Sequence, residues 1–140
     1  MQAEELLREI WKIITEYNKH TLDEFGDDTL SRLAYKLAGY KATLGPLVAE
    51  TSRELVVARH VFQEEKAKRY KELRDEGLSQ GDSSDMKRIG LLPQAEDHAE
   101  AESLHDKYNK LYYDIGEIVD VLKSELIRRQ SERKESRYGG

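Results

Sequence analysis

Two histidines and a glutamate have the spacing that most resembles a metal site. His98, Glu102 and His105 are four and three residues apart, so a helix would place all three side chains on one face. The chain has no HExxH pattern, and acids and histidines are common on solvated helix faces. The spacing therefore indicates an ordinary solvated face, and we expect no metal and no other cofactor.

A second group of residues has the chemistry of phosphate binding. It combines cations with a tyrosine on both sides of a Gly/Ser/Asp-rich segment, and consists of Lys66, Lys68, Arg69, Tyr70, Arg74, Lys87 and Arg88. Such cations can follow the phosphates of a single strand while the tyrosine ring stacks on a base. The alternative is a salt-bridged helix surface, because acids are interleaved with these bases: Glu64, Glu65, Glu72 and Asp75.

Nucleotide-binding and catalytic motifs are absent from the sequence. There is no GxxxxGK[ST] and no GxGxxG, and Gly77 and Gly81 are too sparse to form a phosphate cradle. Carboxylates are plentiful, but an elongated helical protein offers no dry pocket that would shift their pKa values for acid–base chemistry. We therefore expect a protein that is not an enzyme.

The chain has 140 residues and no cysteine, which suits one domain without disulfides or cysteine-based zinc sites. No stretch approaches 18 consecutive apolar residues, and the start lacks the basic and apolar pattern of a signal peptide. We expect a cytoplasmic protein, in a bacterial host if the gene is carried by a phage, with no membrane partner.

Charge is unevenly distributed along the chain. The net charge is −5, yet residues 1–28 hold eight acids and three bases, whereas residues 123–138 hold six bases and three acids. Local charge decides which partners bind. The basic run from Arg128 to Arg137 would contact nucleic acid, pair with the acidic start between subunits, or keep the chain soluble.

Two apolar seams with helical spacing indicate the fold. The first comprises Leu33, Leu37, Tyr40, Leu44, Val48, Thr51, Leu55, Ala58 and Phe62, and the second Leu104, Tyr108, Leu111, Ile115, Ile118 and Leu122. Such stripes need a partner, since an unpaired apolar face is unstable in water. We predict an all-α fold: a long, coiled-coil-like antiparallel helical hairpin with a short N-terminal helix, forming a homo-oligomer.

The predicted boundaries follow from turn and capping residues within a single helical domain, residues 1–140. An N-terminal helix over 3–18 carries Trp11, which packs against the hairpin or a neighbouring subunit. Arm one covers 28–76 and is capped by Asp27 or Asp28, with a kink or a short break near 45–46 at Gly45-Pro46. A loop follows over 77–92, with at most a short turn near Met86. Arm two covers 93–134, and 135–140 form a frayed tail.

The order of these features resembles the UvsY-type recombination mediators of bacteriophages. The resemblance covers residues 33–137 and rests on Lys66-Ala67-Lys68-Arg69-Tyr70, the loop Gly77–Asp85, and a second long helix with Lys123-Ser124 and a basic tail. It implies a ring-like homo-oligomer that binds single-stranded DNA, displaces single-strand-binding protein and helps to load a RecA-like recombinase. Lys66, Lys68 and Arg69 would then contact the DNA. The acidic net charge and Gly45-Pro46 depart from that pattern.

Two hypotheses follow from the sequence. In the first, oligomerisation multiplies a modest basic site, and the protein is a single-stranded-DNA-binding recombination mediator. In the second, it is a structural or adaptor protein, such as a virion component, an assembly chaperone or an inhibitor of a host enzyme, without nucleic-acid binding.

Overall fold

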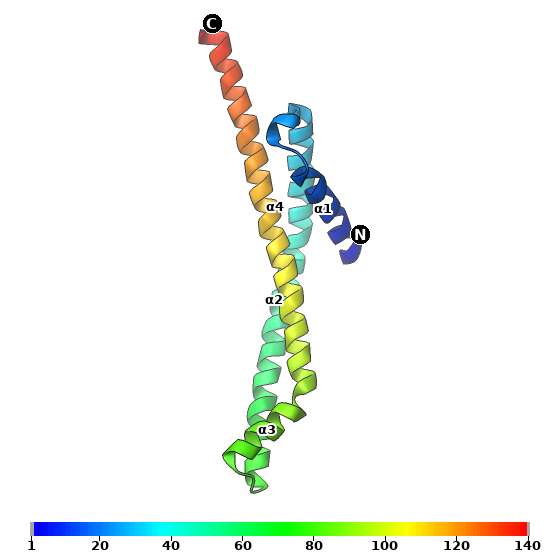
Figure 1. Cartoon of the computed structure of the whole chain (residues 1–140), viewed down its shortest axis with the longest axis vertical. Coiled ribbons are helices and arrows are strands. Elements are labelled where there is room, and N and C mark those ends of the chain that lie inside the picture. Colours follow the sequence, from blue (N-terminus) through cyan, green and yellow to red (C-terminus); the bar gives the residue numbers. More distant parts are fainter. Residues whose placement is uncertain (1, 140) are drawn as a thin grey trace. The chain divides into compact units, whose positions relative to one another are not determined.

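The predicted all-α fold is confirmed (Figure 1). The structure is a computed structural model that describes residues 2–139, with the backbone only for residues 88, 89, 138 and 139. The elements are α1 (Ala3–Asn18), the 3-10 helix η1 (Leu22–Glu24), α2 (Asp27–Asp75), α3 (Gln80–Gly90) and α4 (Leu92–Gly139). The two longest helices, α2 and α4, pack against each other as an antiparallel hairpin. No strand occurs within residues 2–139, and no described helix is long and apolar enough to cross a bilayer.

The chain divides into two compact units. The first unit combines Met1–Gly45 with Leu111–Gly140, and the second unit is Pro46–Lys110. Each unit therefore contains one half of α2 and one half of α4. The first unit also contains α1, and the second contains α3.

The first unit is a three-helix bundle. Helix α1 lies beside the first half of α2 (Figure 1), and Tyr40 on α2 donates a hydrogen bond of 2.7 Å to Glu9 on α1. Aliphatic side chains from all three helices form its core: Leu6, Leu7, Ile10, Ile14, Leu30, Ala34, Leu37, Leu44, Leu111, Ile115, Val119 and Leu122. Three amphipathic faces enclose one core, as helical-bundle packing requires.

Eight of the fifteen predicted seam residues are buried. These are Leu37, Leu44, Thr51, Leu55, Tyr108, Leu111, Ile115 and Leu122. Phe62 and Ile118 are half-buried, and Val119 takes the buried place near Ile118 because a straight helix drifts away from a strict heptad. Leu104 is 39% exposed and Trp11, at the edge of the buried face of α1, is 51% exposed.

Helix α2 continues through Gly45-Pro46 without interruption. The predicted short break is therefore absent, although the division between the two units falls between these residues. A proline in a helix removes only one bond of the backbone ladder, and long helical segments on both sides maintain the rest. The kink stays a prediction.

The predicted loop over 77–92 is wrong, because α3 occupies most of it. Gly77, with φ +92°, ends α2 in a Schellman arrangement: its amide donates to the Arg74 carbonyl, and the Leu78 amide donates to the Leu73 carbonyl. Ser79 then caps α3, since its Oγ accepts from the Asp82 amide at 3.1 Å. Gly77 thus ends α2 and Ser79 begins α3, instead of forming a loop.

Both ends of α4 differ slightly from the predicted arm. Helix α4 starts at Leu92, and Pro93 lies in its first turn, where the missing amide costs little. It continues to Gly139, past the predicted end at 134, because residues 132–138 contain no glycine or proline. The predicted frayed tail over 135–140 is therefore helical as far as Gly139. Residue 140 lies outside the described residues.

The core of the first unit is testable with two isoleucines on α4. Ile115 is fully buried and Ile127 is 63% exposed. We expect Ile115→Ala to lower the free energy of unfolding by about 2–5 kcal/mol, because it leaves a cavity. Ile127→Ala should change it by less than about 0.5 kcal/mol. Urea unfolding followed by circular dichroism measures both, and equal effects would contradict this core.

Candidate nucleic-acid interface

Three of the predicted DNA-contacting residues meet around one depression in the second unit. The Lys87 Nζ lies 5.1 Å from the centre of the Tyr70 ring. A depression of about 390 Å³, which we call the lysine hollow, is lined by Gln63, Lys66, Ala67, Tyr70, Gln80, Ser84 and Lys87. Two lysines, a tyrosine ring and a serine therefore share one surface, although α2 and α3 supply them separately.

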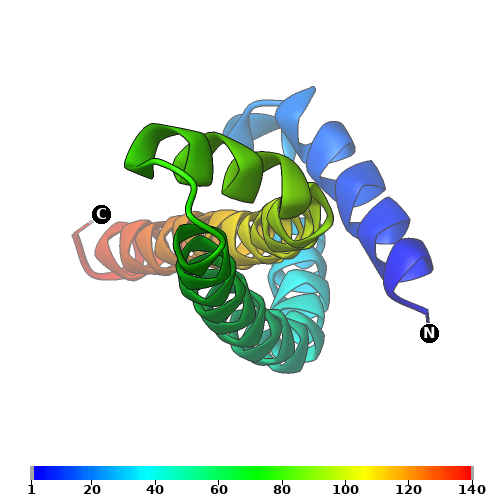
Figure 2. The same ribbon diagram turned by 90° about the horizontal axis from the view of Figure 1, so that it is seen from below.

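Helix α3 makes this arrangement possible. It lies across the C-terminal end of α2 (Figure 2), and its position brings Lys87 back towards Tyr70. Ser83 is fully buried and Leu91, directly after α3, is 5% exposed. These two residues hold α3 against the rest of the second unit, so that Ser84 and Lys87 face the hollow.

A second depression adjoins the first. It has a volume of about 380 Å³ and is lined by Phe62, Lys66, Ser84, Lys87, Leu91, Leu92 and Ala95. Lys66 and Lys87 line both depressions, and the Lys66 Nζ lies 5.4 Å from the centre of the Phe62 ring. Each lysine thus lies over an aromatic ring, an arrangement in which the ring stabilises the cation.

The structure separates the other predicted contacts from this hollow. Lys68 is two residues from Lys66 and so lies about 200° around α2 from it. Arg69 Nη1 lies 3.4 Å from Glu72 Oε2, and Arg74 Nη1 donates a hydrogen bond of 3.3 Å to the Leu78 carbonyl. The side chain of Arg88 lies outside the described residues. Arg69 therefore belongs to the salt-bridged surface that was the alternative prediction. Lys66 and Lys87, in contrast, have no ion pair within the described part of the chain.

The two histidines considered for metal binding have separate packing roles. His98 stacks on Phe62, with ring centres 5.9 Å apart and planes 9° apart. His105 Nδ1 lies 3.1 Å from Thr51 Oγ1, in a half-buried contact between α4 and α2. Within the described residues, no group of three candidate ligands lies close enough to hold a metal ion.

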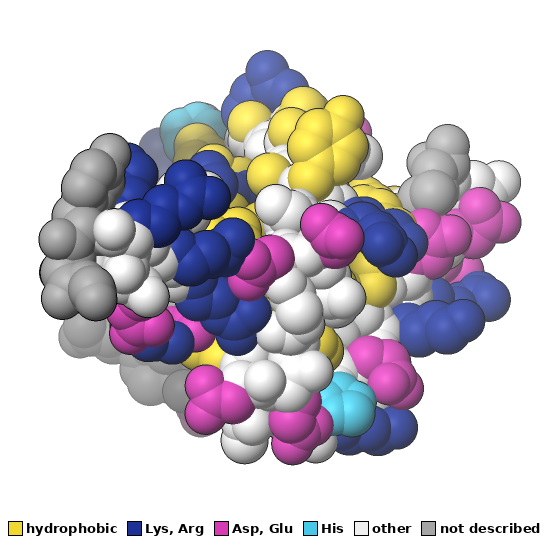
Figure 3. Space-filling model, turned by 90° about the horizontal axis from the view of Figure 1, so that it is seen from above, with side chains coloured by type: hydrophobic (Ala, Val, Ile, Leu, Met, Phe, Trp, Pro, Cys, Tyr) yellow, Lys and Arg dark blue, Asp and Glu magenta, His cyan; other side chains and the backbone are white. Residues whose placement is uncertain are grey.

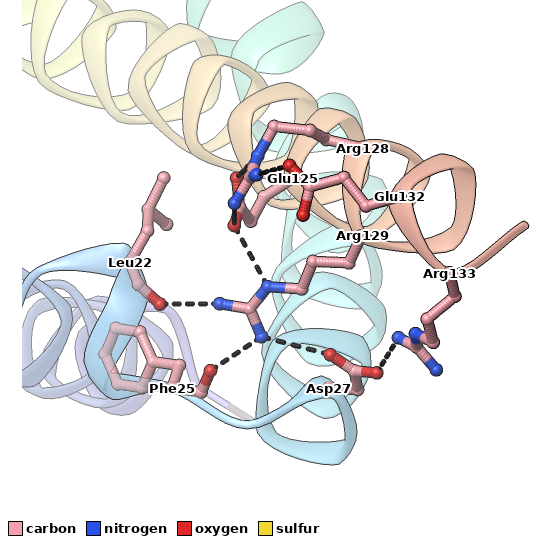
Figure 4. A network of polar contacts seen from close by, with 8 residues as sticks. All are labelled: Leu22, Phe25, Asp27, Glu125, Arg128, Arg129, Glu132 and Arg133. Atoms are coloured by element: carbon pink, nitrogen blue, oxygen red, sulfur yellow. Dashed lines mark hydrogen bonds and ion pairs between the residues drawn. The ribbon is translucent and has the colours of Figure 1, made fainter. Parts of the chain in front are cut away.

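The C-terminal basic run has a structural role that the sequence did not reveal. Figure 4 shows Arg129 reaching from α4 to the turn before α2. It donates to the carbonyls of Leu22 (2.9 Å) and Phe25 (2.8 Å), and to the carboxylates of Asp27 (3.0 Å) and Glu125 (2.9 Å). One guanidinium thereby joins η1, the start of α2 and α4 within the first unit.

Further ion pairs surround Arg129. Arg133 also binds Asp27, and Arg128 binds both Glu125 and Glu132 (Figure 4). The acidic start and the basic end of the sequence therefore meet inside one chain. Basic and acidic side chains are interspersed on the face drawn in Figure 3. Two of the arginines expected to face nucleic acid or another subunit, Arg129 and Arg133, are thus already paired with Asp27.

These pairs shift the pKa values of the two carboxylates. Hydrogen bonds from Arg128, and then from Arg129, lower the pKa of Glu125 to about 2. The hydrogen bond from Arg129 is also the main reason why the pKa of Asp27 is lowered. Charge-assisted hydrogen bonds favour the ionised form of each carboxyl group.

The protein is thus an all-α helical hairpin with a surface depression that is lined by two lysines and a tyrosine. No protein-family model, curated protein or solved structure shows a significant match to this chain. Its own residues are therefore the guide to its function.

The Arg129 network predicts a specific response to pH. Because Glu125 and Asp27 have lowered pKa values in the folded state, their contribution to stability is present above their ordinary values of 4.5 and 3.8. It is lost as the pH falls through the folded-state values. We expect the urea midpoint of the unsubstituted protein to fall steadily from pH 5 to about 2.

The substitution Arg129→Met tests the cause. It should lower the urea midpoint at pH 7 and flatten the dependence on pH, since Asp27 loses its main partner and Glu125 loses the second of its two arginine partners. Lys134→Met is the matched control, because Lys134 is exposed on the same part of α4. If both variants kept the pH profile of the unsubstituted protein, the network would not stabilise the fold.

Proposed function

We propose that this protein is a non-enzymatic, single-stranded-DNA-binding accessory protein of DNA recombination. The observation that supports the proposal best is the lysine hollow, where Lys66 and Lys87 flank Tyr70. Single-strand binders combine cations that follow the backbone with aromatic rings on which bases stack. The hollow has both components within one residue cluster.

The lysines of the hollow suit phosphate better than the arginines of the chain do. Lys66 and Lys87 are near rings instead of carboxylates, so phosphate would not have to displace an intramolecular ion pair. An ammonium on a flexible stem also adjusts to successive phosphates of an irregular strand. The Ser84 hydroxyl at the same hollow offers one further donor.

A single hollow binds few phosphates, and the net charge of −5 repels DNA. The proposal therefore includes a homo-oligomer, ring-like by resemblance, that presents several hollows to one strand. Linked sites convert later binding events into intramolecular ones and raise the overall affinity without new kinds of contact. Affinity that rests on phosphates in this way falls steeply with salt.

The role in recombination is the finer part of the proposal. It rests on the resemblance of residues 66–70 and 123–137 to UvsY-type mediators, since residues 80–85 lie in α3 and not in the loop that the resemblance assumed. In this role the oligomer would bind the strand, displace single-strand-binding protein and help to load a RecA-like recombinase. Many weak contacts serve such a transfer, because each one can release its nucleotides separately.

A structural or adaptor protein is the second candidate. It is favoured by large exposed side chains away from the hollow, among them Tyr35 at 85% and Tyr113 at 62% exposure. Exposed aromatic residues are common anchors of protein interfaces. This candidate requires no affinity for nucleic acid.

The lysine hollow is testable by fluorescence anisotropy with a labelled oligothymidylate across a salt series. We expect Lys66→Ala with Lys87→Ala to weaken binding and to reduce the slope of log K against log[salt] by about 0.7 for each phosphate that the variant no longer binds. Tyr70→Ala should remove about 1–3 kcal/mol for each stacked base, which is roughly 5- to 150-fold in affinity.

The matched control removes two lysines elsewhere in the second unit, Lys107→Ala with Lys110→Ala. Both are exposed on α4, so the net charge changes equally. If the control weakened binding as much as the hollow variant, binding would depend on total charge alone. An unsubstituted protein that binds no oligonucleotide even at low salt would support the adaptor instead.

A further inference from the structure

A long stretch in the second half of α2 has no buried side chain. No side chain from Val56 to Glu72 is buried, although the buried positions of α2 recur every three to seven residues from Leu30 to Leu55. Val57 is 61% exposed and Val61 is 44% exposed. They are four residues apart and so lie on one face of the helix.

A groove lies along these valines. Its volume is about 430 Å³, and its walls are Arg53, Glu54, Val57, Ala58 and Val61 of α2 together with Gln94 and Asp97 of α4. The floor is aliphatic and the rim carries both signs of charge. An apolar strip with a mixed-charge rim is typical of helix-to-helix contacts.

We propose that this groove is a homotypic interface, in which α2 of a second copy lies antiparallel along Val57 and Val61. The two-fold axis passes near Arg59, so that Val57 packs against Val61 of the partner subunit and the reverse. The proposal rests on the proposed function and deepens it, because it gives one surface through which two copies associate. A ring of more copies would need a second contact, since a two-fold interface closes at two.

The charges along this face support a second copy as the occupant. In the antiparallel register Glu50, about 20° around α2 from Val57, lies opposite Lys68 of the partner subunit, which is about 20° from Val61. The two-fold axis repeats this attractive pair once. A parallel arrangement would instead place Glu50 and Lys68 each against its own copy, which is repulsive.

Two glutamates lie at the same level of this register without facing each other. Glu54 and Glu64 of the partner subunit are on opposite flanks of the contact, and Glu64 also lies 3.0 Å from His60 in its own chain. The carboxylates at the rim, including Asp97, disfavour a nucleic-acid strand in this groove. The face thus suits a protein with the same charges in reverse order.

The interface leaves the lysine hollow free. Lys66 and Tyr70 lie roughly 140–180° around α2 from the valines, on the opposite side of the helix. A dimer formed in this way would present two hollows, and Lys68, which does not line the hollow, would have an interfacial role.

Sedimentation velocity on the full chain over a range of concentrations tests the interface. We expect the unsubstituted protein to dimerise reversibly, and Val61→Asp to raise the dissociation constant at least tenfold. Val56→Asp is the matched control, because Val56 is 60% exposed but lies about 100–140° around α2 from the groove valines. It should leave the dissociation constant within about twofold. Far-ultraviolet circular dichroism verifies that each variant is folded.

A charge exchange tests the register. Glu50→Lys alone and Lys68→Glu alone should each weaken the dimer, and the double variant should restore it to within about threefold of the unsubstituted protein. The proposal would be overturned if the unsubstituted protein were strictly monomeric. It would also be overturned if the double variant were as weak as the two single changes combined, or if Val56→Asp and Val61→Asp had equal effects. Oligonucleotide anisotropy separates the two proposals: loss of DNA binding with an intact dimer contradicts only the proposed function.

Discussion

The antiparallel register of α2 and α4 is the constraint on which each unit depends. In the first unit Asp27 lies opposite Arg129, and Lys41 crosses Gly116, where an added Cβ would lie 2.9 Å from the Lys41 Nζ. In the second unit Thr51 lies opposite His105. Each step along α2 is matched by a step back along α4. A shift of one residue between α2 and α4 would break the polar contacts of both units. The apolar seams alone specify the register poorly, so these polar contacts complete it.

The two units use different amounts of apolar burial. Three helices enclose the core of the first unit, whereas the second unit buries few large side chains and includes the polar Thr51 and Ser83 among its buried residues. Segments with little buried apolar packing open at low free-energy cost. The lysine hollow and the groove along Val57 and Val61 both lie in this second unit. A thin core leaves helix faces of this unit available for contacts with other molecules.

Periodicity in the sequence was sufficient to predict α1, α2 and α4, with the ends of α1 and α2 within one residue, but not α3 or the C-terminal end of α4. The seams through Leu37 and Ile115 correctly gave the hairpin, because spacing of three and four residues has one structural meaning. Composition around Gly77 suggested a loop, since glycine and serine favour both turns and caps; only the backbone bonds of Leu78 and Asp82 distinguish these roles. The Arg129 network was not predictable, because its partners include backbone carbonyls, which any residue provides.

Net charge is a poor guide to the partners of this protein, because its cations are used in two different ways. Arg129 joins two carbonyls and two carboxylates at once, which requires the planar, multidentate guanidinium. Lys66 and Lys87 lie instead over aromatic rings at the surface. The arginine-rich end of the sequence looks the more suitable for phosphate, yet much of its charge is neutralised within the chain. The two lysines of the hollow keep their charge near rings instead of carboxylates. An acidic chain can therefore offer a locally cationic surface. Under the proposed function, the affinity of that surface would depend on how many copies act on one strand.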